Sequence, residues 1–367
     1  MVSEPRIGFR RPACTTGGNA NSCDDPAVAT TRRKVILGAG ALVVVGGSYL
    51  AARRRFDGPV ERPAGVPVSK FDKHATAELV TQGIDLTGKT ALITGATSGL
   101  GLETLRVLAM RGAHCIVTGR TLDKAREACA SVKGKTTPVA LELEKWDTIV
   151  AASDEVRALG MPIDMLVLNA GIMALPTLEK VYGIEKHFVV NHLGHFILAN
   201  RLLDQVKAAA QGRIVVVSSR GYQWAPAAGI EFDNLGGDRD YKPNKMYGQS
   251  KLANVLMTLQ LAQQLRGTAT TANAVHPGII NTNLGRHMSV WTRAITPLIG
   301  WTFMRSVEQG AATTCYVATA PALATVSGCY FEDCNPVVPA AGKHMEDLVL
   351  AQKLWDKSTE LTARYLA

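Results

Sequence analysis

Short apolar runs alternate with longer helical segments through most of the chain. We interpret the apolar runs as strands at about 89–95, 114–119, 137–143, 164–170, 213–219, 270–276 and 328–332. The run at 213–219, RIVVVSS, is rich in β-branched residues, which suits a strand buried on both faces of a parallel sheet. The alternation predicts an α/β fold, in which helices flank both faces of a doubly wound parallel sheet of about seven strands.

The first 62 residues form a different kind of sequence. After a polar tail and the basic run Arg32 to Lys34, 18 residues from Val35 to Ala52 carry no charge, and three arginines follow. An apolar run of this length is just sufficient to span a bilayer. We therefore predict a tail and hydrophobic anchor (35–52) in residues 1–62 and a single α/β domain in 63–367. Glycines weaken the hydrophobicity of the run, so a signal-type segment is the alternative.

Most of the net charge lies in this N-terminal region. Residues 1–62 hold ten Arg or Lys and five Asp or Glu, so five of the nine net positive charges are there. Arginines beside an apolar run are attracted to anionic lipid, and the charge is thus no argument for nucleic-acid binding. The charge bias favours a membrane anchor with the α/β domain on the cytoplasmic side, an organelle envelope or export being the alternatives.

A glycine-rich turn follows the first predicted strand. It reads TGATSGLG and contains Gly95, Thr97, Ser98, Gly99, Leu100 and Gly101. Glycines at these positions let the strand turn sharply, let backbone amides approach a pyrophosphate, and let the next helix pack closely on the sheet. A strand before the turn and a helix after it, to about Arg111, indicate a dinucleotide cradle.

Tyr247 and Lys251 are four residues apart in KMYGQSKLAN, so they share one face of a helix. A tyrosine normally has a pKa of about 10, and a cation held beside the phenol favours the phenolate and lowers that pKa. Tyr247 is therefore a candidate general acid or base.

Two further groups of polar residues follow predicted strands. Ser218 and Ser219 end the strand at 213–219, and Asn169-Ala170-Gly171 ends the strand at 164–170. Ligands of open α/β sheets bind outside the carboxyl ends of the strands, where a serine can donate a hydrogen bond to a substrate oxygen. Asn191 lies further on, in the helical stretch from Phe188 to Leu203.

In this order, the motifs resemble those of the short-chain dehydrogenase/reductase family, which has a Rossmann-type fold. The resemblance covers about Gly83 to Leu366. The runs NHLGHF, YGQSKLAN, AVHPG and QGAATT resemble the branch of the retinol dehydrogenases and the WW-domain oxidoreductase.

The resemblance implies the catalytic roles. Ser219, rather than Ser218, would orient the substrate oxygen, and Tyr247 would exchange the proton. Lys251 would lower the pKa of Tyr247 and bind the nicotinamide ribose, while Asn191 would hold a water that connects Lys251 to solvent.

The resemblance also implies the residues that surround the cofactor. Asn169 and Gly171 would flank it, and Pro277, Gly278 and Thr282 would cover its carboxamide end. Glu142, followed by Leu143, stands where the family usually has an aspartate near the adenine.

Arg120 indicates which cofactor is preferred. Enzymes that select NAD usually place a carboxylate at the end of the second strand, whereas here the strand ends in Gly119-Arg120. An arginine can pair with a 2′-phosphate, so NADP(H) is favoured over NAD(H). In the alternative interpretation, Arg120 is a solvated residue that starts a helix.

An apolar and aromatic segment lies between Ile279 and Ser306, with Trp291, Trp301 and Phe303 among its residues. We interpret it as a candidate substrate lid, because such walls suit a lipophilic ligand. Helix packing against the core or a second subunit is the alternative.

Together these features predict an oxidoreductase that transfers a hydride between NADP(H) and a lipophilic alcohol or carbonyl of the retinoid, steroid or fatty aldehyde class. The alternatives are an NADPH-sensing interaction protein of a membrane complex, as a chloroplast-envelope relative is thought to be, and a protochlorophyllide-type reductase. Family analogy suggests a homodimer or homotetramer through the helices of Asn191 and Tyr247. Seven scattered cysteines, without a C-x-x-C pair, predict reduced thiols and no metal site.

Overall fold

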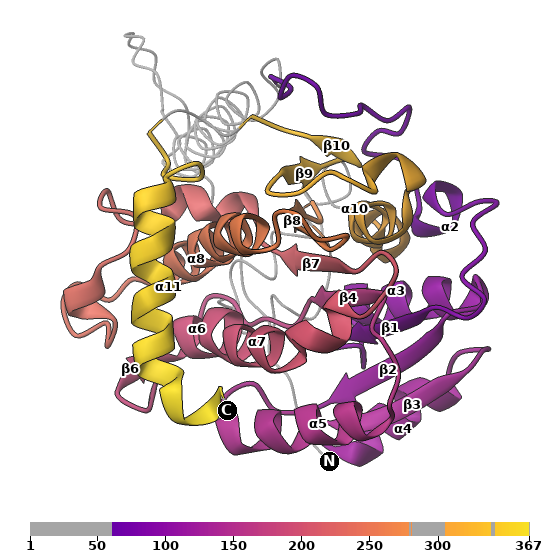
Figure 1. Ribbon diagram of the computed structural model, residues 1–367. Coiled ribbons are helices and arrows are strands. Elements are labelled where there is room, and N and C mark those ends of the chain that lie inside the picture. Colours follow the sequence, from indigo (N-terminus) through magenta and orange to yellow (C-terminus); the bar gives the residue numbers. More distant parts are fainter. Residues whose placement is uncertain (1–60, 279, 281–304, 339–341, 367) are drawn as a thin grey trace, which may run out of the picture. The chain divides into compact units, whose positions relative to one another are not determined.

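One parallel sheet organises the described part of the chain. The computed structural model describes residues 61–278, 280, 305–338 and 342–366. All seven expected strands form, so that prediction is confirmed (Figure 1). They are β1 (Thr90–Ile93), β2 (His114–Gly119), β3 (Thr136–Ala140), β4 (Met165–Leu168), β7 (Arg213–Val217), β8 (Thr271–His276) and β9 (Tyr330–Glu332).

The strand order explains where a ligand can bind. The eight-stranded sheet has the order β10-β9-β8-β7-β4-β1-β2-β3, and every pairing is parallel except that of β10 (Asn335–Pro336) with β9. Leu92 of β1 pairs with Ile116 of β2 on one side and with Leu166 of β4 on the other. The chain thus runs outward from β1 in both directions, and the crevice at such a reversal is where open α/β sheets bind ligands.

Helices cover both faces of this sheet (Figure 1). On one face pack α2 (Ala77–Val80), α3 (Gly99–Met110), α4 (Leu122–Ala130) and α10 (Val307–Thr319). On the other pack α5 (Trp146–Ala158), α7 (Gly194–Lys207), α8 (Pro243–Gln264) and α11 (Leu348–Thr362). Short 3-10 helices lie at η2 (Arg220–Trp224), η3 (Phe232–Asn234), η5 (Pro321–Leu323) and η6 (Ala363–Tyr365).

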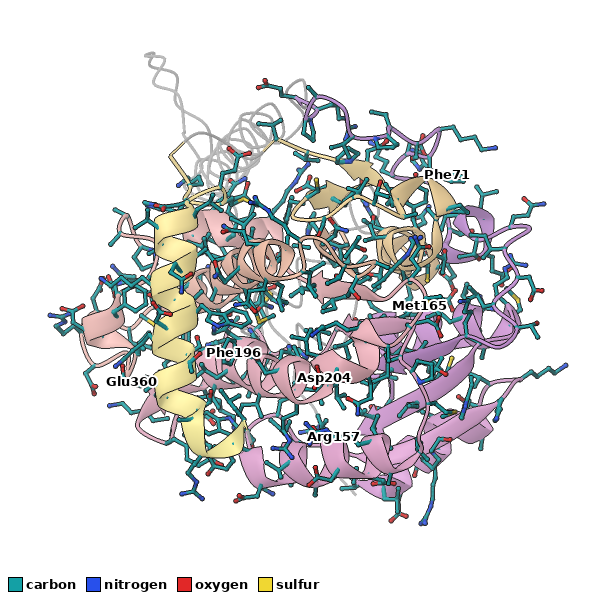
Figure 2. The ribbon with its side chains drawn as sticks, in the orientation of Figure 1. Phe71, Arg157, Met165, Phe196, Asp204 and Glu360 are labelled. Atoms are coloured by element: carbon teal, nitrogen blue, oxygen red, sulfur yellow. The ribbon has the colours of Figure 1, made fainter. Side chains whose placement is uncertain are left out.

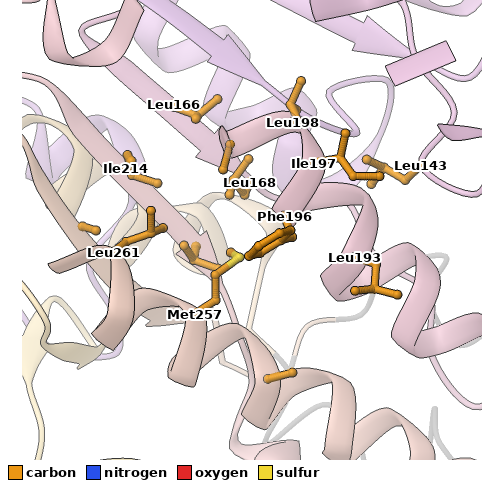
Figure 3. Close-up of a cluster of buried hydrophobic side chains, with 14 of the residues drawn as sticks. Leu143, Leu166, Leu168, Leu193, Phe196, Ile197, Leu198, Ile214, Met257 and Leu261 are labelled. Carbon is orange, nitrogen blue, oxygen red and sulfur yellow. The ribbon is translucent and has the colours of Figure 1, made fainter. Parts of the chain in front are cut away.

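The strands divide their side chains between two hydrophobic cores. In β1, Ala91 and Ile93 face the core with α3 and α10, whereas Leu92 faces the core with α7 and α8. Phe196 of α7 is 1% exposed and lies among Leu168, Leu193 and Met257 in the second core (Figure 3). Fully burying a side chain of this size contributes about 1.5–3 kcal/mol, so Phe196 helps to hold α7 against the sheet.

The C-terminal helix α11 covers α7 and α8. Trp355 packs edge-on against Phe196, with ring centroids 4.7 Å apart, and Ser358 Oγ lies 2.9 Å from His192 Nε2. In Figure 2 the labelled Glu360 marks α11 and Phe196 marks α7. The helix α11 therefore contacts Phe196 of α7 and His192 of η1 (Val189–Leu193).

The predicted helical stretch around Asn191 is confirmed, but it contains a π-helical turn that we did not predict. The chain forms α6 (Lys186–Phe188), the π-helical turn η1 (Val189–Leu193) and then α7, without a break. A small hairpin of β5 (Lys180–Val181) and β6 (Ile184–Glu185), which we did not predict, precedes α6.

The predicted anchor at 35–52 lies outside the described residues, and the domain boundary at residue 62 stays a prediction. Among the helices that are described, none combines the length and the apolar character needed to cross a bilayer.

Candidate active site

The turn after β1 has the geometry of a dinucleotide cradle. Gly95 has φ +65°, and a Cβ at Gly101 would lie 2.6 Å from Asn169 Nδ2, so neither position accepts a side chain easily. Ser98 caps α3 without a side-chain hydrogen bond to the helix, and the first turn of α3 carries no acidic residue. The first amides of α3 are thus available to an anion, which fits a pyrophosphate.

Gly119 lies beside this turn, whereas the side chain of Leu100 points away from it. A Cβ at Gly119, the last residue of β2, would lie 2.9 Å from Thr97 Cγ2, so the end of β2 borders the cradle. Leu100 points elsewhere: its Cδ2 packs close to Gly310 of α10. Leu100 can therefore offer a cofactor its backbone but not its side chain.

Thr94 joins the ends of β1 and β4. Its Oγ1 accepts hydrogen bonds from Asn169 N (2.8 Å) and Ala170 N (3.0 Å) and lies 2.9 Å from Nε2 of the buried His195. His195 Nδ1 lies 3.0 Å from the Asn191 carbonyl, which can only accept, so Nδ1 carries the hydrogen and Nε2 accepts from Thr94. Burial lowers the pKa of His195 to about 4, which keeps it neutral.

We did not predict Thr94 and His195 as site residues. The available signals were a hydroxyl directly before the first glycine of the cradle and a second histidine in NHLGHF.

Tyr247 and Lys251 lie on α8, and each is only 4% exposed. Lys251 Nζ lies 5.8 Å from the centroid of the Tyr247 ring and donates a hydrogen bond to the Val217 carbonyl at the end of β7 (3.0 Å). Burial lowers the pKa of Lys251 to about 8.

The pKa of Tyr247 is raised rather than lowered, so the expected direction of its net shift is wrong. Burial raises the pKa of Tyr247 to about 12, and the Ser219 hydroxyl beside the phenol acts in the opposite direction. The reason is that desolvation disfavours the phenolate more than the neighbouring groups stabilise it.

The two serines after β7 have different environments. Ser219 Oγ accepts from Gly221 N (3.0 Å), and the Ser219 side chain acts on Tyr247 by lowering its pKa. Gly221 permits this approach, since a Cβ there would lie 2.6 Å from the Tyr247 ring and 3.3 Å from Ser219 Oγ. Ser218 is 2% exposed and donates to the backbone carbonyl of Lys251 (2.7 Å). The structure thus brings Ser219, and not Ser218, to the Tyr247 side chain.

The side chain of Asn191 forms hydrogen bonds with other residues of the protein. Its Oδ1 accepts from Ile172 N (2.8 Å), and its Nδ2 donates to Ile172 O (3.0 Å) and Ser250 Oγ (2.9 Å). A Cβ at Gly171 would lie 3.2 Å from Asn191 Oδ1 and 3.5 Å from Lys251 Nζ. Both polar groups therefore face the backbone of Gly171, where the second acceptor site of Oδ1 and the ammonium could hold a water or a ribose hydroxyl.

The remaining predicted cofactor residues lie at the ends of β2, β3 and β8. Arg120 is exposed and forms no hydrogen bond or ion pair with the other described residues. Glu142 pairs with Lys145 (2.8 Å), and the buried Leu143 packs against Gly194.

Pro277 and Gly278 follow β8. Gly278 has φ +91° and lies against the side chain of Arg305, which in turn pairs with Asp333 at 2.5 Å. We did not predict a role for Arg305. Thr282 and nearly all of the candidate lid lie outside the described residues.

Comparisons with known proteins agree with this geometry. A sequence profile for the short chain dehydrogenase family matches residues 89–232. The chain is 40% identical over 305 residues to the short-chain dehydrogenase TIC 32 A, chloroplastic, of Brassica napus, covering 80% of this chain and 94% of that protein. It is 36% identical over 346 residues to retinol dehydrogenase 14 of Homo sapiens, covering 88% and 97%.

A solved structure agrees as well. An uncharacterized protein from Mycobacterium paratuberculosis is 30% identical and superimposes with a TM-score of 0.63, covering 77% of this chain and 97% of that one. The chain therefore belongs to the short-chain dehydrogenase/reductase family of oxidoreductases and, within it, to the retinol dehydrogenase-like branch.

Proposed function

We propose that this protein transfers a hydride between NADP(H) and a lipophilic alcohol or carbonyl, with Ser219, Tyr247 and Lys251 as its catalytic residues. The observation that carries the proposal is the meeting of the Ser219 and Tyr247 hydroxyls at the end of β7, with the Lys251 ammonium beside them. When bound, the nicotinamide supplies or accepts the hydride.

Tyr247 is suited to give a proton to a substrate oxygen. Since burial raises the pKa of Tyr247 to about 12, the phenol is protonated at neutral pH and is the acid that carbonyl reduction requires. Hydrogen bonds from Tyr247 and Ser219 would stabilise the negative charge that develops on the oxygen. Lys251, charged below about pH 8, would make the loss of the Tyr247 proton easier during the reaction.

NADP(H) is the cofactor that the residues favour. The available amides at the start of α3 would hold the pyrophosphate, Asn169 and Gly171 would flank the nicotinamide half, and Lys251 with Asn191 would meet its ribose. Arg120 is exposed beside Gly119, which borders the cradle, and has no carboxylate partner among the described residues. It is therefore available to a 2′-phosphate.

Trp224 supports an apolar substrate. Its ring lies 6.3 Å from that of Tyr247, and its side chain remains 45% exposed. The backbone of η2 is held against α8 because residue 248 is glycine: a Cβ there would lie 2.7 Å from the Trp224 carbonyl carbon. A large exposed aromatic surface fixed beside the proton donor favours a ligand that covers it with apolar atoms. The retinol dehydrogenases among the relatives are consistent with this class.

The second candidate is a protein that binds NADPH and reports it to a partner without turnover. Its support is the 40% identity to TIC 32 A. The retention of Ser219, Tyr247 and Lys251 in one place favours the enzyme, because binding alone does not need them.

The test is to mix the purified full-length protein with NADPH or NADH and with retinal, a long-chain aldehyde or a short hydrophilic aldehyde. We expect NADPH oxidation with the apolar carbonyls, and a Tyr247→Phe protein that still binds NADPH but has a kcat about 10²–10⁴-fold lower. NADPH binding without turnover of any carbonyl would favour the sensor, and equal rates for Tyr247→Phe and wild type would refute the role of Tyr247.

A further inference from the structure

A buried glutamate–histidine pair lies beside Tyr247 and has no part in the chemistry described above. His187 of α6 is 0% exposed and Glu185 of β6 is 1% exposed. His187 Nδ1 and Glu185 Oε1 are 2.6 Å apart. Glu185 Oε2 also accepts from Phe188 N (3.2 Å), so both carboxylate oxygens are fixed.

The other nitrogen of His187 contacts the loop after β4. Leu175 N donates to His187 Nε2 at 3.4 Å, which requires a lone pair on that nitrogen. The hydrogen of the neutral ring is therefore on Nδ1 and is donated to Glu185. In this arrangement the carboxylate selects the tautomer that lets His187 accept from Leu175.

The loop from Ile172 to Leu175 is held by side chains on several sides. Asn191 bonds both the N–H and the carbonyl of Ile172, and Tyr241 Oη donates to the Leu175 carbonyl (2.8 Å). Between these points Ala174 has φ +54°, a conformation that a residue other than glycine rarely adopts without support. The loop thus keeps a shape that depends on the hydrogen bonds around it.

His187 also contacts the catalytic tyrosine. Its ring meets the Tyr247 ring edge-on, with centroids 6.2 Å apart and planes at 74°. One imidazole therefore touches both the loop that follows Gly171 and the proposed proton donor.

We propose that His187, oriented by Glu185, is a positioning residue that fixes the Ile172–Leu175 loop and the Tyr247 ring relative to each other. This inference rests on the proposed function, because the geometry that it maintains is that of the proton donor and the cofactor-flanking backbone. The position of this loop would then depend on a hydrogen bond to an imidazole as well as on apolar packing.

Glutamine is the informative replacement. Its amide can donate to Glu185 and its carbonyl can accept from Leu175, so His187→Gln keeps both hydrogen bonds without a titratable group. Leucine fills a similar volume but makes neither bond. The titratable groups that contact His187 are Glu185 and Tyr247, and both are unchanged in the two variants.

The experiment compares wild type with the His187→Gln and His187→Leu proteins. Hydrogen–deuterium exchange of peptides that cover 172–178 is measured without cofactor, and kcat and KM are then measured with NADPH and an apolar aldehyde. His192→Leu is the matched control, because His192 is also fully buried but its hydrogen bond reaches Ser358 of α11. Where His187→Leu does not fold, His187→Met replaces it.

We expect His187→Leu to speed exchange in 172–178 about ten-fold and to lower kcat about ten-fold or more, since a buried amide loses its acceptor. His187→Gln should restore both, and His192→Leu should leave both unchanged.

Wild-type exchange in His187→Leu would overturn the inference whether or not the protein turns over any carbonyl. Altered exchange with unchanged kcat would overturn the link to Tyr247. Absence of wild-type turnover refutes the proposed function instead, and the exchange data still decide whether His187 holds the loop.

Discussion

Asn191 Oδ1 and Lys251 Nζ face the same point above the backbone of Gly171. A Cβ at that position would lie 3.2 Å from the amide oxygen and 3.5 Å from the ammonium nitrogen. The absence of a side chain there leaves both polar groups accessible to a ligand, although they come from different helices, η1 and α8.

In Gly171→Ala the added methyl group should therefore occupy the space that Asn191 Oδ1 and Lys251 Nζ face. Gly171 has no positive φ, so alanine is compatible with the backbone and the protein should fold. We expect turnover to fall about 100-fold or more, because a displacement of about 1 Å at the reacting groups has that effect. Thermal unfolding and steady-state kinetics of the variant test this. Near wild-type turnover would mean that nothing has to occupy the point above Gly171.

Ser218 and Ser219 form a matched pair of substitutions. Ser219→Ala removes a hydroxyl from Tyr247 and from the substrate oxygen, so kcat should fall about 10²–10³-fold with little loss of stability. Ser218→Ala removes a buried hydrogen bond to the Lys251 carbonyl and should lower the free energy of unfolding by about 1 kcal/mol. Urea denaturation and kinetics of both proteins distinguish the roles, and the reverse pattern would assign catalysis to Ser218.

Arg120→Asp should change the cofactor preference. The substitution removes the charge that would pair with a 2′-phosphate and adds an acceptor for a ribose 2′-hydroxyl. We expect the Kd for NADPH to rise about ten- to a hundred-fold, because the loss of a hydrogen bond to a charged group has an effect of this size. NADH should then become the better cofactor. Arg126→Ala is the control, because Arg126 is an exposed arginine on α4 that pairs with Asp123. An unchanged ratio of the two affinities in Arg120→Asp would remove the argument for NADP(H).

The strands and the glycine turn after β1 could be predicted because their signals are local. Continuous β-branched runs and a glycine turn between strand and helix depend on neighbouring residues only, and all seven strands formed where we expected them. The hairpin β5–β6 was missed because each strand has two residues, too few to show a period of two.

What the sequence could not predict depends on contacts between distant residues. The π-helical turn at Asn191 accompanies hydrogen bonds to Ile172, and His195 meets Thr94 across 101 positions. The pKa of Tyr247 was predicted in the wrong direction because the nearby cation is visible in the sequence, whereas the burial that outweighs it is not.

Lys251 should produce an alkaline limit to carbonyl reduction. Burial lowers its pKa to about 8, so the ammonium is lost as the pH rises through that value, whereas Tyr247 stays protonated until about 12. The kcat/KM for reduction should fall about ten-fold per pH unit above pH 8, because the active protein must carry one proton on Lys251. In Lys251→Arg, which stays charged, activity at pH 7 should be lower but the decline above pH 8 should disappear. A wild-type profile that is flat to pH 10 would contradict this.

Three buried histidines should make the fold sensitive to acid. Burial lowers the pKa of His192 and His276 to about 3 and that of His195 to about 4, all below the ordinary value of 6.5. Below pH 6.5 these histidines bind protons in the unfolded chain but not in the folded chain. The contribution of each neutral histidine to the free energy of unfolding is therefore fully present above pH 6.5 and is lost as the pH falls.

At pH 5 the expected loss is about 2 kcal/mol for each histidine, or about 6 kcal/mol for the three, which is comparable with the whole stability of a typical domain. Urea denaturation at pH 7 and at pH 5 measures the loss. His192→Gln replaces one histidine away from the proposed catalytic groups and should reduce the difference between the two pH values by about a third. If wild type and His192→Gln lose the same stability between pH 7 and pH 5, His192 is not the buried neutral group that its surroundings imply.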